Sequence, residues 1–297
     1  MSTTYIIATD SNSELSSKWR EKCQLAVIDM PYNLDGEEKI YNFEEGEDIR
    51  HFYQRMRDGA IPTTMQRNAE EFKEFWMPYL EKGLDVLHFS FSSKLSGTYD
   101  SACIAQKELA QHYPDRKIMV VDTKAICPVL GLLLIRCAAL RDEGKSMEEV
   151  AQWMEENYQR GAAFFSVESL EYLKRGGRIS NAAAFFGSML QIKPMLHLDA
   201  EGGLAPVEKI KGRKKAIRRL AEAAAEKMDG AFDKRVFVIH ADCSREADSL
   251  IEHFMQLVPD AELVEKQYVG PVIGAHVGPG MLAIVYFGKD RSAPDTK

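Results

Sequence analysis

Short apolar runs alternate with amphipathic segments along most of this sequence. The runs YIIATD (5–10), DVLHFSF (85–91) and KIMVVD (117–122) have the length and composition of buried β-strands. The segment EDIRHFYQRM (47–56) has one apolar helical stripe, and SGTYDSACIAQKELAQHY (96–113) follows the second run, so both are predicted to be helices. Apolar strands linked through helices are typical of a parallel sheet with both faces covered. The first half is therefore predicted to be a Rossmann-like α/β domain.

The second half of the chain predicts strands with one solvated face. Apolar and polar residues alternate in LAPVEKIK (204–211) and AELVEKQYV (261–269), which favours a mixed or partly antiparallel sheet. Helices are predicted near 213–228 and 244–257. The remaining predicted strands of this half are AAFFSV (162–167), PMLHLD (194–199), RVFVIHAD (235–242) and MLAIVYFG (281–288).

A helical stretch from 128 to 160 is predicted to join the two halves. Gly144 interrupts it, and Ser146 and Glu149 then have the spacing of a capping box for a second helix. With 297 residues the chain has about the length of two domains. We expect an N-terminal α/β domain over 1–160 and a C-terminal α/β domain over 161–297, with the last strand as a candidate to pack back toward the first domain.

Composition excludes several classes of protein. Hydrophobic residues make up 45% and charged residues 28%, which are ordinary values for a soluble globular protein. The longest apolar stretch is broken by Arg136 and is too short to span a bilayer, and the N-terminus shows no secretory signal, so a cytoplasmic location is expected. Five cysteines without a C-x-x-C pair predict neither a disulfide framework nor a metal site.

The net charge of -7 disfavours binding to nucleic acid, which needs a positive surface. The stretch KIKGRKKAIRR (209–219) is a local exception with seven basic residues in eleven. As a helix it would bring Lys211, Lys215 and Arg219 near one face. This face is either solvated or in contact with an anion or an acidic partner. A nucleic-acid accessory role would show a steep salt dependence of DNA binding; no nucleic-acid partner is expected.

Standard catalytic fingerprints are missing from the sequence. It contains no G-x-S-x-G elbow, no G-x-x-x-x-G-K-[ST] phosphate loop and no H-E-x-x-H. The run GPGMLA (278–283) is close to a dinucleotide fingerprint, but it leads into a β-rich run, and Pro279 removes an amide that a phosphate would need. Nucleotide binding is therefore not predicted.

Three clusters of polar residues each follow an apolar strand or a turn. They are TDSNSE (9–14), PTTMQ (62–66) and SFSSKLSGTY (90–99). Ligands of open α/β sheets bind at the carboxyl ends of the strands, and helix N-termini there favour an anion. Serine before a helix is also a common N-cap, so capping alone is the alternative interpretation for Ser11 and Ser93.

The run GPVIGAHVGPG (270–280) contains six glycine or proline residues around one histidine, His276. Such a run predicts a tight turn that brings the backbone close to a ligand. Hydroxyl groups and an imidazole can donate hydrogen bonds to a carboxylate. They can equally form a hydrolase site, a serine-type esterase or acyl-phosphate hydrolase in which Ser93 or Ser96 is the nucleophile and His276 the base. Both functions stay open at this point.

Five ordered motifs together resemble the DegV family of bacterial fatty-acid-binding proteins. They are SSKLSGTY, EYLKRGGRIS, LQIKPML followed by a glycine turn, GRKKAI and GPVIGAHVGPGMLAI, and the resemblance covers essentially the whole chain. It implies the DegV fold: two α/β domains with a lipid tunnel between them that holds one long-chain fatty acid. The apolar segment AAAFFGSML (182–190) and the methionines would supply flexible lining.

The resemblance also implies residue roles. The fatty-acid carboxylate would be bound by Thr64, Ser96 and His276, and Ser93 would assist from the same loop as Ser96. The family usually has T-S-Q-P where this chain has Thr64-Met65-Gln66-Arg67, so one hydroxyl and the turn proline are replaced. We expect this departure to alter the geometry around the head group.

A non-enzymatic role follows from the same resemblance. The protein would take a fatty acid from a membrane surface in a transient contact and present the carboxyl group to an ATP-dependent fatty acid kinase, which forms an acyl phosphate for phospholipid synthesis. Arg178 and Arg213 would contact the partner or the acyl phosphate. No catalytic residue, metal or cofactor is expected in this chain, because phosphoryl transfer needs a nucleotide site that the partner must supply.

Overall fold

The computed structural model describes residues 4–41, 49–179 and 192–291. The chain forms two compact units. The first comprises Met1–Glu47 and Thr64–Tyr158, and the second comprises Asp48–Thr63 and Gln159–Lys297. A short segment from the first half of the sequence thus belongs to the second unit. The apolar segment 182–190 lies outside the described residues.

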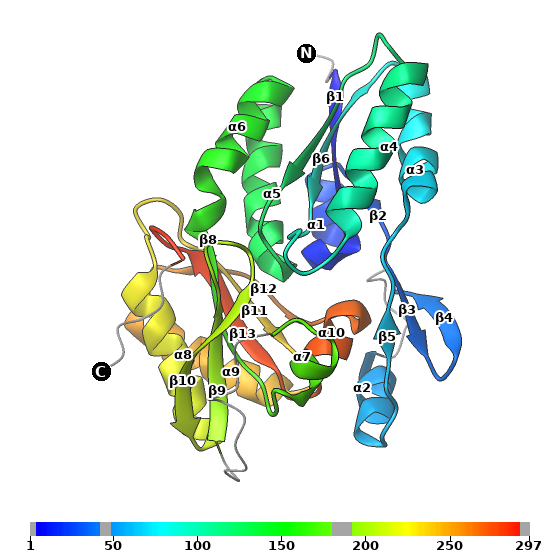
Figure 1. Ribbon diagram of the computed structural model, residues 1–297. Helices are drawn as coiled ribbons and strands as arrows, with labels where there is room; N and C mark the ends of the chain where they lie inside the picture. Colours follow the sequence, from blue (N-terminus) through cyan, green and yellow to red (C-terminus); the bar gives the residue numbers. More distant parts are fainter. Residues whose placement is uncertain (1–3, 42–48, 180–191, 292–297) are drawn as a thin grey trace. The chain divides into compact units, whose positions relative to one another are not determined.

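The first unit is built on a parallel sheet of four strands. These are β1 (Tyr5–Asp10), β2 (Leu25–Ile28), β6 (Asp85–Ser90) and β7 (Ile118–Asp122), in the order β2-β1-β6-β7 (Figure 1). Every neighbouring pair is parallel. The predicted parallel sheet is therefore confirmed, with β2 as a strand that the sequence pattern did not predict.

Helices cover both faces of this sheet. In Figure 1, α3 (Ala69–Glu81) and α4 (Thr98–His112) lie on one side, and α5 (Cys127–Asp142) and α6 (Met147–Asn157) lie on the other. Phe72 and Trp76 of α3 are fully buried in the core beneath the first pair. The predicted capping box of α6 is present, because Ser146 and Glu149 bond each other's backbone amides.

Smaller elements complete the first unit. A hairpin of β3 (Pro31–Leu34) and β4 (Glu37–Ile40) forms a three-stranded sheet with β5 (Thr63–Thr64), in the order β4-β3-β5. A 3-10 helix, η1 (Ser11–Ser13), follows β1, and α1 (Ser17–Lys22) precedes β2. The short helix η2 (Tyr158–Arg160) stands where the chain leaves this unit.

The second unit contains a mixed sheet of six strands, as predicted. The order is β10-β9-β8-β13-β11-β12. Within this sheet β11 and β12 are parallel, and all other neighbours are antiparallel. The strands are β8 (Gly161–Ser166), β9 (Ile192–Leu198), β10 (Leu204–Lys211), β11 (Arg235–His240), β12 (Glu262–Tyr268) and β13 (Leu282–Phe287). The last strand of the chain is thus central in this sheet.

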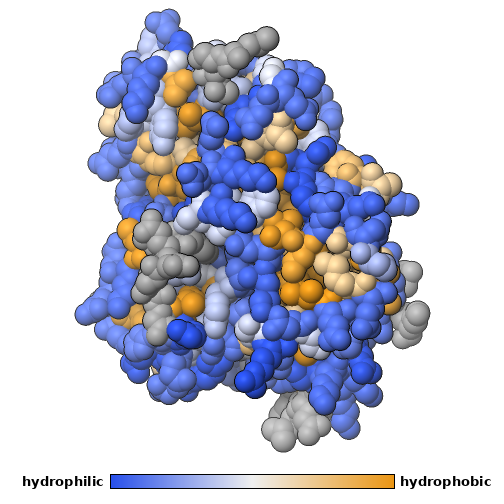
Figure 2. Space-filling view, turned by 180° about the vertical axis from the view of Figure 1, so that it is seen from behind, coloured by the Kyte–Doolittle hydropathy of each residue, from blue (hydrophilic) through white to orange (hydrophobic). Residues whose placement is uncertain are grey.

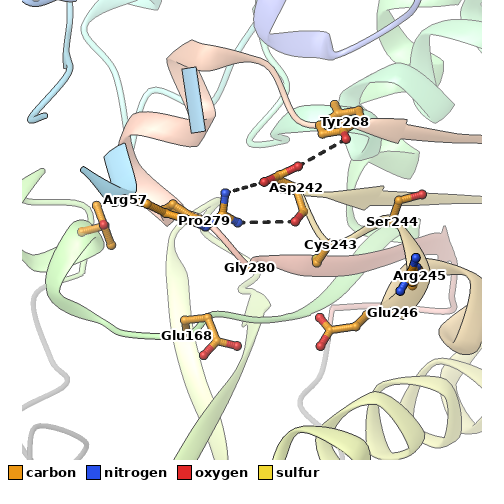
Figure 3. Close-up of a pocket in the computed structure, with 11 residues that line it drawn as sticks. Arg57, Glu168, Asp242, Cys243, Ser244, Arg245, Glu246, Tyr268, Pro279 and Gly280 are labelled. Atoms are coloured by element: carbon orange, nitrogen blue, oxygen red, sulfur yellow. Dashed lines mark hydrogen bonds and ion pairs between the residues drawn. The ribbon is translucent and has the colours of Figure 1, made fainter. Parts of the chain in front are cut away.

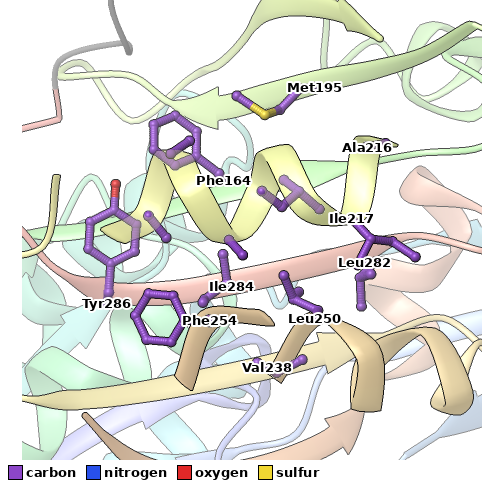
Figure 4. Packing of buried hydrophobic residues seen from close by; sticks show 14 of the residues in the cluster. Phe164, Met195, Ala216, Ile217, Val238, Leu250, Phe254, Leu282, Ile284 and Tyr286 are labelled. Atoms are coloured by element: carbon purple, nitrogen blue, oxygen red, sulfur yellow. The ribbon is translucent and has the colours of Figure 1, made fainter. Parts of the chain in front are cut away.

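Two long helices, α8 (Arg213–Lys227) and α9 (Ser244–Leu257), pack on this sheet. Figure 4 shows Ile217 of α8 and Phe254 of α9 among side chains of the strands, such as Phe164 and Ile284. Full burial of a side chain of this size contributes about 1.5–3 kcal/mol. This core fixes the strand ends that position the polar residues described below.

Four described strands of the second unit, β8, β10, β11 and β12, end at the same edge of the sheet; β10 is among them because it is antiparallel to β9, which is antiparallel to β8. Because β13 is antiparallel to both β8 and β11, and β11 is parallel to β12, the carboxyl ends of β8, β11 and β12 point the same way. The helices α7 (Glu171–Arg175) and α10 (Pro271–Val277) follow β8 and β12, and they contact each other. Helix α2 (Ile49–Arg57) also contacts α10. Strand ends of this kind are where α/β proteins place ligands.

Hydrophilic residues dominate the face seen in Figure 2, and hydrophobic residues gather there in separate patches. Among the described residues, the exposed large hydrophobic side chains are Ile40, Ile61, Met65, Ile104, Leu257 and Leu263. In the parts of the chain that the structure describes, no helix combines the length and the apolar character needed to cross a membrane.

Candidate functional site

The histidine of the glycine- and proline-rich run lies on a helix. The predicted turn over 270–280 is wrong in its central part, because Pro271–Val277 forms α10. Gly270 is the N-cap, and proline fits the first helical position because its missing amide is not needed there. Gly278, with a φ of 75°, ends the helix, and its amide donates to the carbonyl of Gly274. His276 therefore sits in the last turn of α10.

The glycines of this run permit close packing of other elements. A Cβ atom on Gly274 would lie 2.6 Å from the hydroxyl oxygen of Tyr53. A Cβ atom on Gly278 would collide with the ring of Tyr172, and one on Gly280, where φ is 82°, would collide with the side chain of Glu168. The expected close approach of the backbone is thus an approach to other side chains of the second unit.

The imidazole of His276 lies against a second glycine motif. A Cβ atom on Gly176 would collide with Nδ1 of His276. Burial, and then the guanidinium of Arg178, lower the pKa of His276 to about 4. The imidazole is therefore neutral at neutral pH, with one nitrogen that donates and one that accepts. A neutral donor beside a fixed cation suits a carboxylate.

Arg178 reaches this position through the end of α7. The helix ends at Gly176, and Gly177 adopts a φ of 69°. The backbone amide of Arg178 then donates to the carbonyl of Leu173 at 3.0 Å, and its guanidinium donates to the carbonyl of Gly176. The structure thus brings together two of the predicted residues, His276 and Arg178, which are far apart in the sequence.

Arg213 is tied into the second unit by several contacts. Its side chain, 15% exposed, donates from Nε to Glu246 at 2.9 Å and from Nη2 to the carbonyl of Gly280 at 2.7 Å. Its Nη1 lies 3.6 Å from a carboxylate oxygen of Glu168. Burial opposes the charge, but Glu246 more than offsets this and raises the pKa of Arg213. Arg213 therefore links α8, α9 and the turn that precedes β13.

A pocket of about 670 Å³ lies at the same edge of the second sheet (Figure 3). Figure 3 shows Arg57 of α2 paired with Asp242, to which the hydroxyl of Tyr268 also donates at 3.3 Å. The lining residues are Arg57, Glu168, Tyr172, Asp242, Cys243, Ser244, Arg245, Glu246, Tyr268, Pro279 and Gly280. The six predicted binding residues, all in described parts of the chain, do not line this pocket. Its charged lining does not suit an alkyl chain.

In the first unit, the segment after Thr64 lies beside the loop that carries Ser96. A Cβ atom on Gly97 would collide with the amide oxygen of Gln66, and Nε2 of Gln66 donates to the hydroxyl of Ser101 at 3.3 Å. The hydroxyl of Ser96 lies 2.8 Å from that of Thr98 and accepts from the Thr98 amide. The two predicted hydroxyl clusters thus adjoin within this unit.

Ser93 has a different partner from the one expected. Its hydroxyl donates to Oδ2 of Asp122 at 2.6 Å, and its amide donates to Oδ1 of the same carboxylate at 3.1 Å. The single hydroxyl proton is therefore already donated, so Ser93 does not fit the role of a donor to a head group. It is not a helix cap either, because the N-cap of α4 is Gly97.

Ser11 likewise does not cap a helix. The residue that caps η1 is Asp10, whose carboxylate accepts from the Asn12 amide at 3.0 Å. The hydroxyl of Ser11 accepts instead from the amide of Met30 at 2.9 Å. The capping interpretation is therefore wrong for both serines.

Side-chain contacts of Arg67 hold the segment 65–67, where the chain departs from the family pattern. Arg67, in the place of the expected proline, donates from Nε to the carbonyl of Asp29 at 2.8 Å and pairs with Glu71. Met65 is 38% exposed. In the family pattern a proline ring would restrict the backbone after Thr64. In this chain the side-chain contacts of Arg67 fix the same segment instead.

The geometry gives little support to a hydrolase. A serine triad needs a carboxylate that orients the imidazole. Among the described residues, the charged group that shifts the pKa of His276 is the guanidinium of Arg178. The proton of Ser93 is donated to a carboxylate. Binding of an acid group is therefore the better interpretation of these residues.

Comparison with known proteins matches this chain over nearly its whole length. A family model described as "Uncharacterised protein, DegV family" matches residues 4–289. A DegV domain-containing protein of Clostridium perfringens is 38% identical over 287 residues, which are 97% of this chain and 98% of the relative.

Solved structures of DegV proteins are also similar to this chain over nearly its whole length. The structure of DegV from Bacillus subtilis, described as a fatty acid binding protein, has a TM-score of 0.81 at 33% identity and covers 97% of this chain and 100% of its own. A DegV family protein from Thermus thermophilus, described by its fatty acid binding, has a TM-score of 0.82 at 32% identity, with coverage of 96% and 99%. The chain belongs to the DegV family.

Proposed function

We propose that this protein binds one long-chain fatty acid and holds its carboxyl group with Thr64, Ser96 and His276. The observation that carries the proposal is the neutral imidazole of His276, packed on Gly176 beside Arg178. A carboxylate needs donors when it leaves water, because burial without partners costs several kcal/mol. The imidazole N–H and the two hydroxyls are such donors. The described fatty-acid binding of the relatives from Bacillus subtilis and Thermus thermophilus supports the same ligand.

The alkyl chain supplies most of the binding free energy in this proposal. Each buried methylene contributes about 0.8 kcal/mol, so about fourteen methylenes give on the order of 10 kcal/mol before the costs of association. The bound fatty acid should therefore survive purification. The interdomain tunnel implied by the resemblance stays a prediction.

The protein then presents the bound carboxyl group to a partner kinase, which forms an acyl phosphate. Arg178 is suited to stabilise the phosphorylated product, because the positive charge of its guanidinium already lowers the pKa of His276. Arg213 would contact the partner or the acyl phosphate from the start of α8. A transient contact with a membrane surface would supply the fatty acid.

Extraction of the purified protein tests the ligand. Protein expressed in a bacterial host and extracted with organic solvent should release about one fatty acid per chain, counted by mass spectrometry. His276→Ala and Ser96→Ala should each lower this occupancy or the rate of coupled phosphorylation. His253→Ala, which changes a partly exposed histidine on α9, is the matched control. Full occupancy and full turnover in both site variants would refute the head-group assignment.

A second experiment separates lipid binding from kinase coupling. Arg178→Ala should keep its fatty acid but form acyl phosphate more slowly in the presence of ATP, magnesium and the partner kinase. If the variant loses the lipid as well, Arg178 is part of the head-group site. If phosphorylation continues at the wild-type rate, the proposed role of Arg178 is wrong.

A further inference from the structure

Two carboxylates bracket the serine-rich loop of the first unit. The loop follows β6, which lies between β1 and β7 in the sheet. Asp10 is the last residue of β1 and Asp122 is the last residue of β7, so both carboxylates lie at the carboxyl edge where the loop begins. Parallel strands bring these residues to one edge although they are far apart in the sequence.

Each carboxylate accepts hydrogen bonds from this loop. Oδ2 of Asp10 accepts from the amide of Phe91 at 3.2 Å. Asp122 accepts from the amide and the hydroxyl of Ser93, and its Oδ1 also accepts from the amide of Lys124 at 3.1 Å. Charge-assisted hydrogen bonds of this kind are stronger than neutral ones. The start of the loop is therefore fixed from both neighbouring strands.

The rest of the loop is a compact turn built on Ser92. The amides of Leu95 and Ser96 donate to the carbonyl of Ser92, at 3.1 and 3.3 Å, and the amide of Lys94 donates to its hydroxyl. The amide of Ser92 itself donates to the carbonyl of Ala125, three residues after Asp122. The position of Ser96 thus depends on anchors that lie beyond the end of β7.

We infer that Asp122 is a positioning residue that holds the serine-rich loop through Ser93 and so presents Ser96 to the ligand. Ser93 is the donor of this contact and does not itself touch the fatty acid. The inference rests on the proposed function of Ser96. The two serines of this loop then have different roles. Ser93 fixes the backbone of the loop, and Ser96 binds the carboxyl group of the fatty acid.

A double-mutant cycle tests the inference. Ser93→Ala and Asp122→Asn should each weaken the affinity for a fluorescent fatty acid by roughly three- to tenfold, which is the effect of losing one hydrogen bond. The double variant should be no weaker than Asp122→Asn alone, because the hydroxyl contact that Ser93→Ala removes is one of the contacts that Asp122→Asn also disrupts. Asp115→Asn, at an exposed carboxylate before β7, is the control and should bind like the wild type.

The opposite pattern would overturn the inference. If Ser93 bound the fatty acid directly, Ser93→Ala would weaken binding while Asp122→Asn would preserve or tighten it, because the serine proton would become available. Hydrogen exchange gives a readout that does not depend on lipid. Asp122→Asn should accelerate exchange of the Ser93 and Lys94 amides, and unchanged exchange contradicts the positioning role. Wild-type protein that binds no fatty acid would instead refute the proposed function.

Discussion

The imidazole of His276 packs directly on the Cα atom of Gly176, so that no side chain fits between them. These residues are far apart in the sequence and meet because α10 contacts α7 in the second unit. Gly176 has an ordinary helical conformation at the end of α7, so the need for glycine at this position is one of space. The imidazole of His276 can therefore occupy this position only because Gly176 has no Cβ atom.

Gly176→Ala should displace the imidazole and weaken fatty-acid binding more than it weakens the fold. Insertion of a methyl group into a packed contact costs about 1–3 kcal/mol, and His276 is the side chain that must give way. We expect occupancy to fall several-fold while urea unfolding stays cooperative. Gly230→Ala is the matched control, because a Cβ atom there meets no other atom within 4 Å. Full occupancy in Gly176→Ala would show that the ring position does not matter.

Local patterns predicted much of the fold. LAPVEKIK coincides with β10, and the capping box at Ser146 and Glu149 marks the start of α6. Both signals are short-range, since strand alternation and capping need only neighbouring residues. Helix α3 and the β3–β4 hairpin were not predicted, and the segment 49–57 gave no sign that it belongs to the second unit.

The helix that carries His276 could not be predicted from its own sequence. Gly274 disfavours a helix, and seven residues are too few to be helical alone. Contacts with Tyr53 and Tyr172 stabilise it, and these partners lie in distant parts of the chain. The same holds for Ser93, whose carboxylate partner stands at the end of another strand. Motif resemblance identified candidate residues but not their partners.

Tyr53→Phe should loosen α10 and lower fatty-acid retention. The Tyr53 hydroxyl donates to the carbonyl of Val269 at 2.7 Å, just before the helix, and both residues are fully buried. A buried carbonyl left without its donor costs about 1–3 kcal/mol. Urea denaturation measures this cost, and hydrogen exchange in 271–277 reports on the helix. Tyr113→Phe, in a partly exposed tyrosine after α4, is the control. Unchanged exchange and retention would show that Tyr53 does not stabilise α10.

His88 should make the protein sensitive to acid. This residue of β6 is fully buried between Phe72 and Trp76, with ring centroids 5.2 and 5.3 Å away, and neither ring nitrogen has a hydrogen-bond partner among the described residues. Burial lowers the pKa of His88 to about 3, whereas an unfolded histidine titrates near 6.5. Between these values the unfolded chain binds a proton that the folded chain does not. The free energy of unfolding should therefore fall as pH drops below about 6.5, by about 1.4 kcal/mol per pH unit from this group.

Replacement of His88 by phenylalanine separates this effect from other titrations. His276 and His240, both with a pKa lowered to about 4, chiefly by burial, add to the same acid-side slope in the wild type. Between pH 6.5 and pH 4, His88→Phe should reduce the change in the free energy of unfolding with pH by the contribution of one proton, about 1.4 kcal/mol per pH unit. Urea denaturation at several pH values measures this change. It should also raise stability at neutral pH, because two unpaired ring nitrogens leave the core. His112→Phe, on the exposed side of α4, controls for the exchange of an imidazole for a phenyl ring. A slope identical to that of the wild type would mean that His88 does not resist protonation in the folded protein.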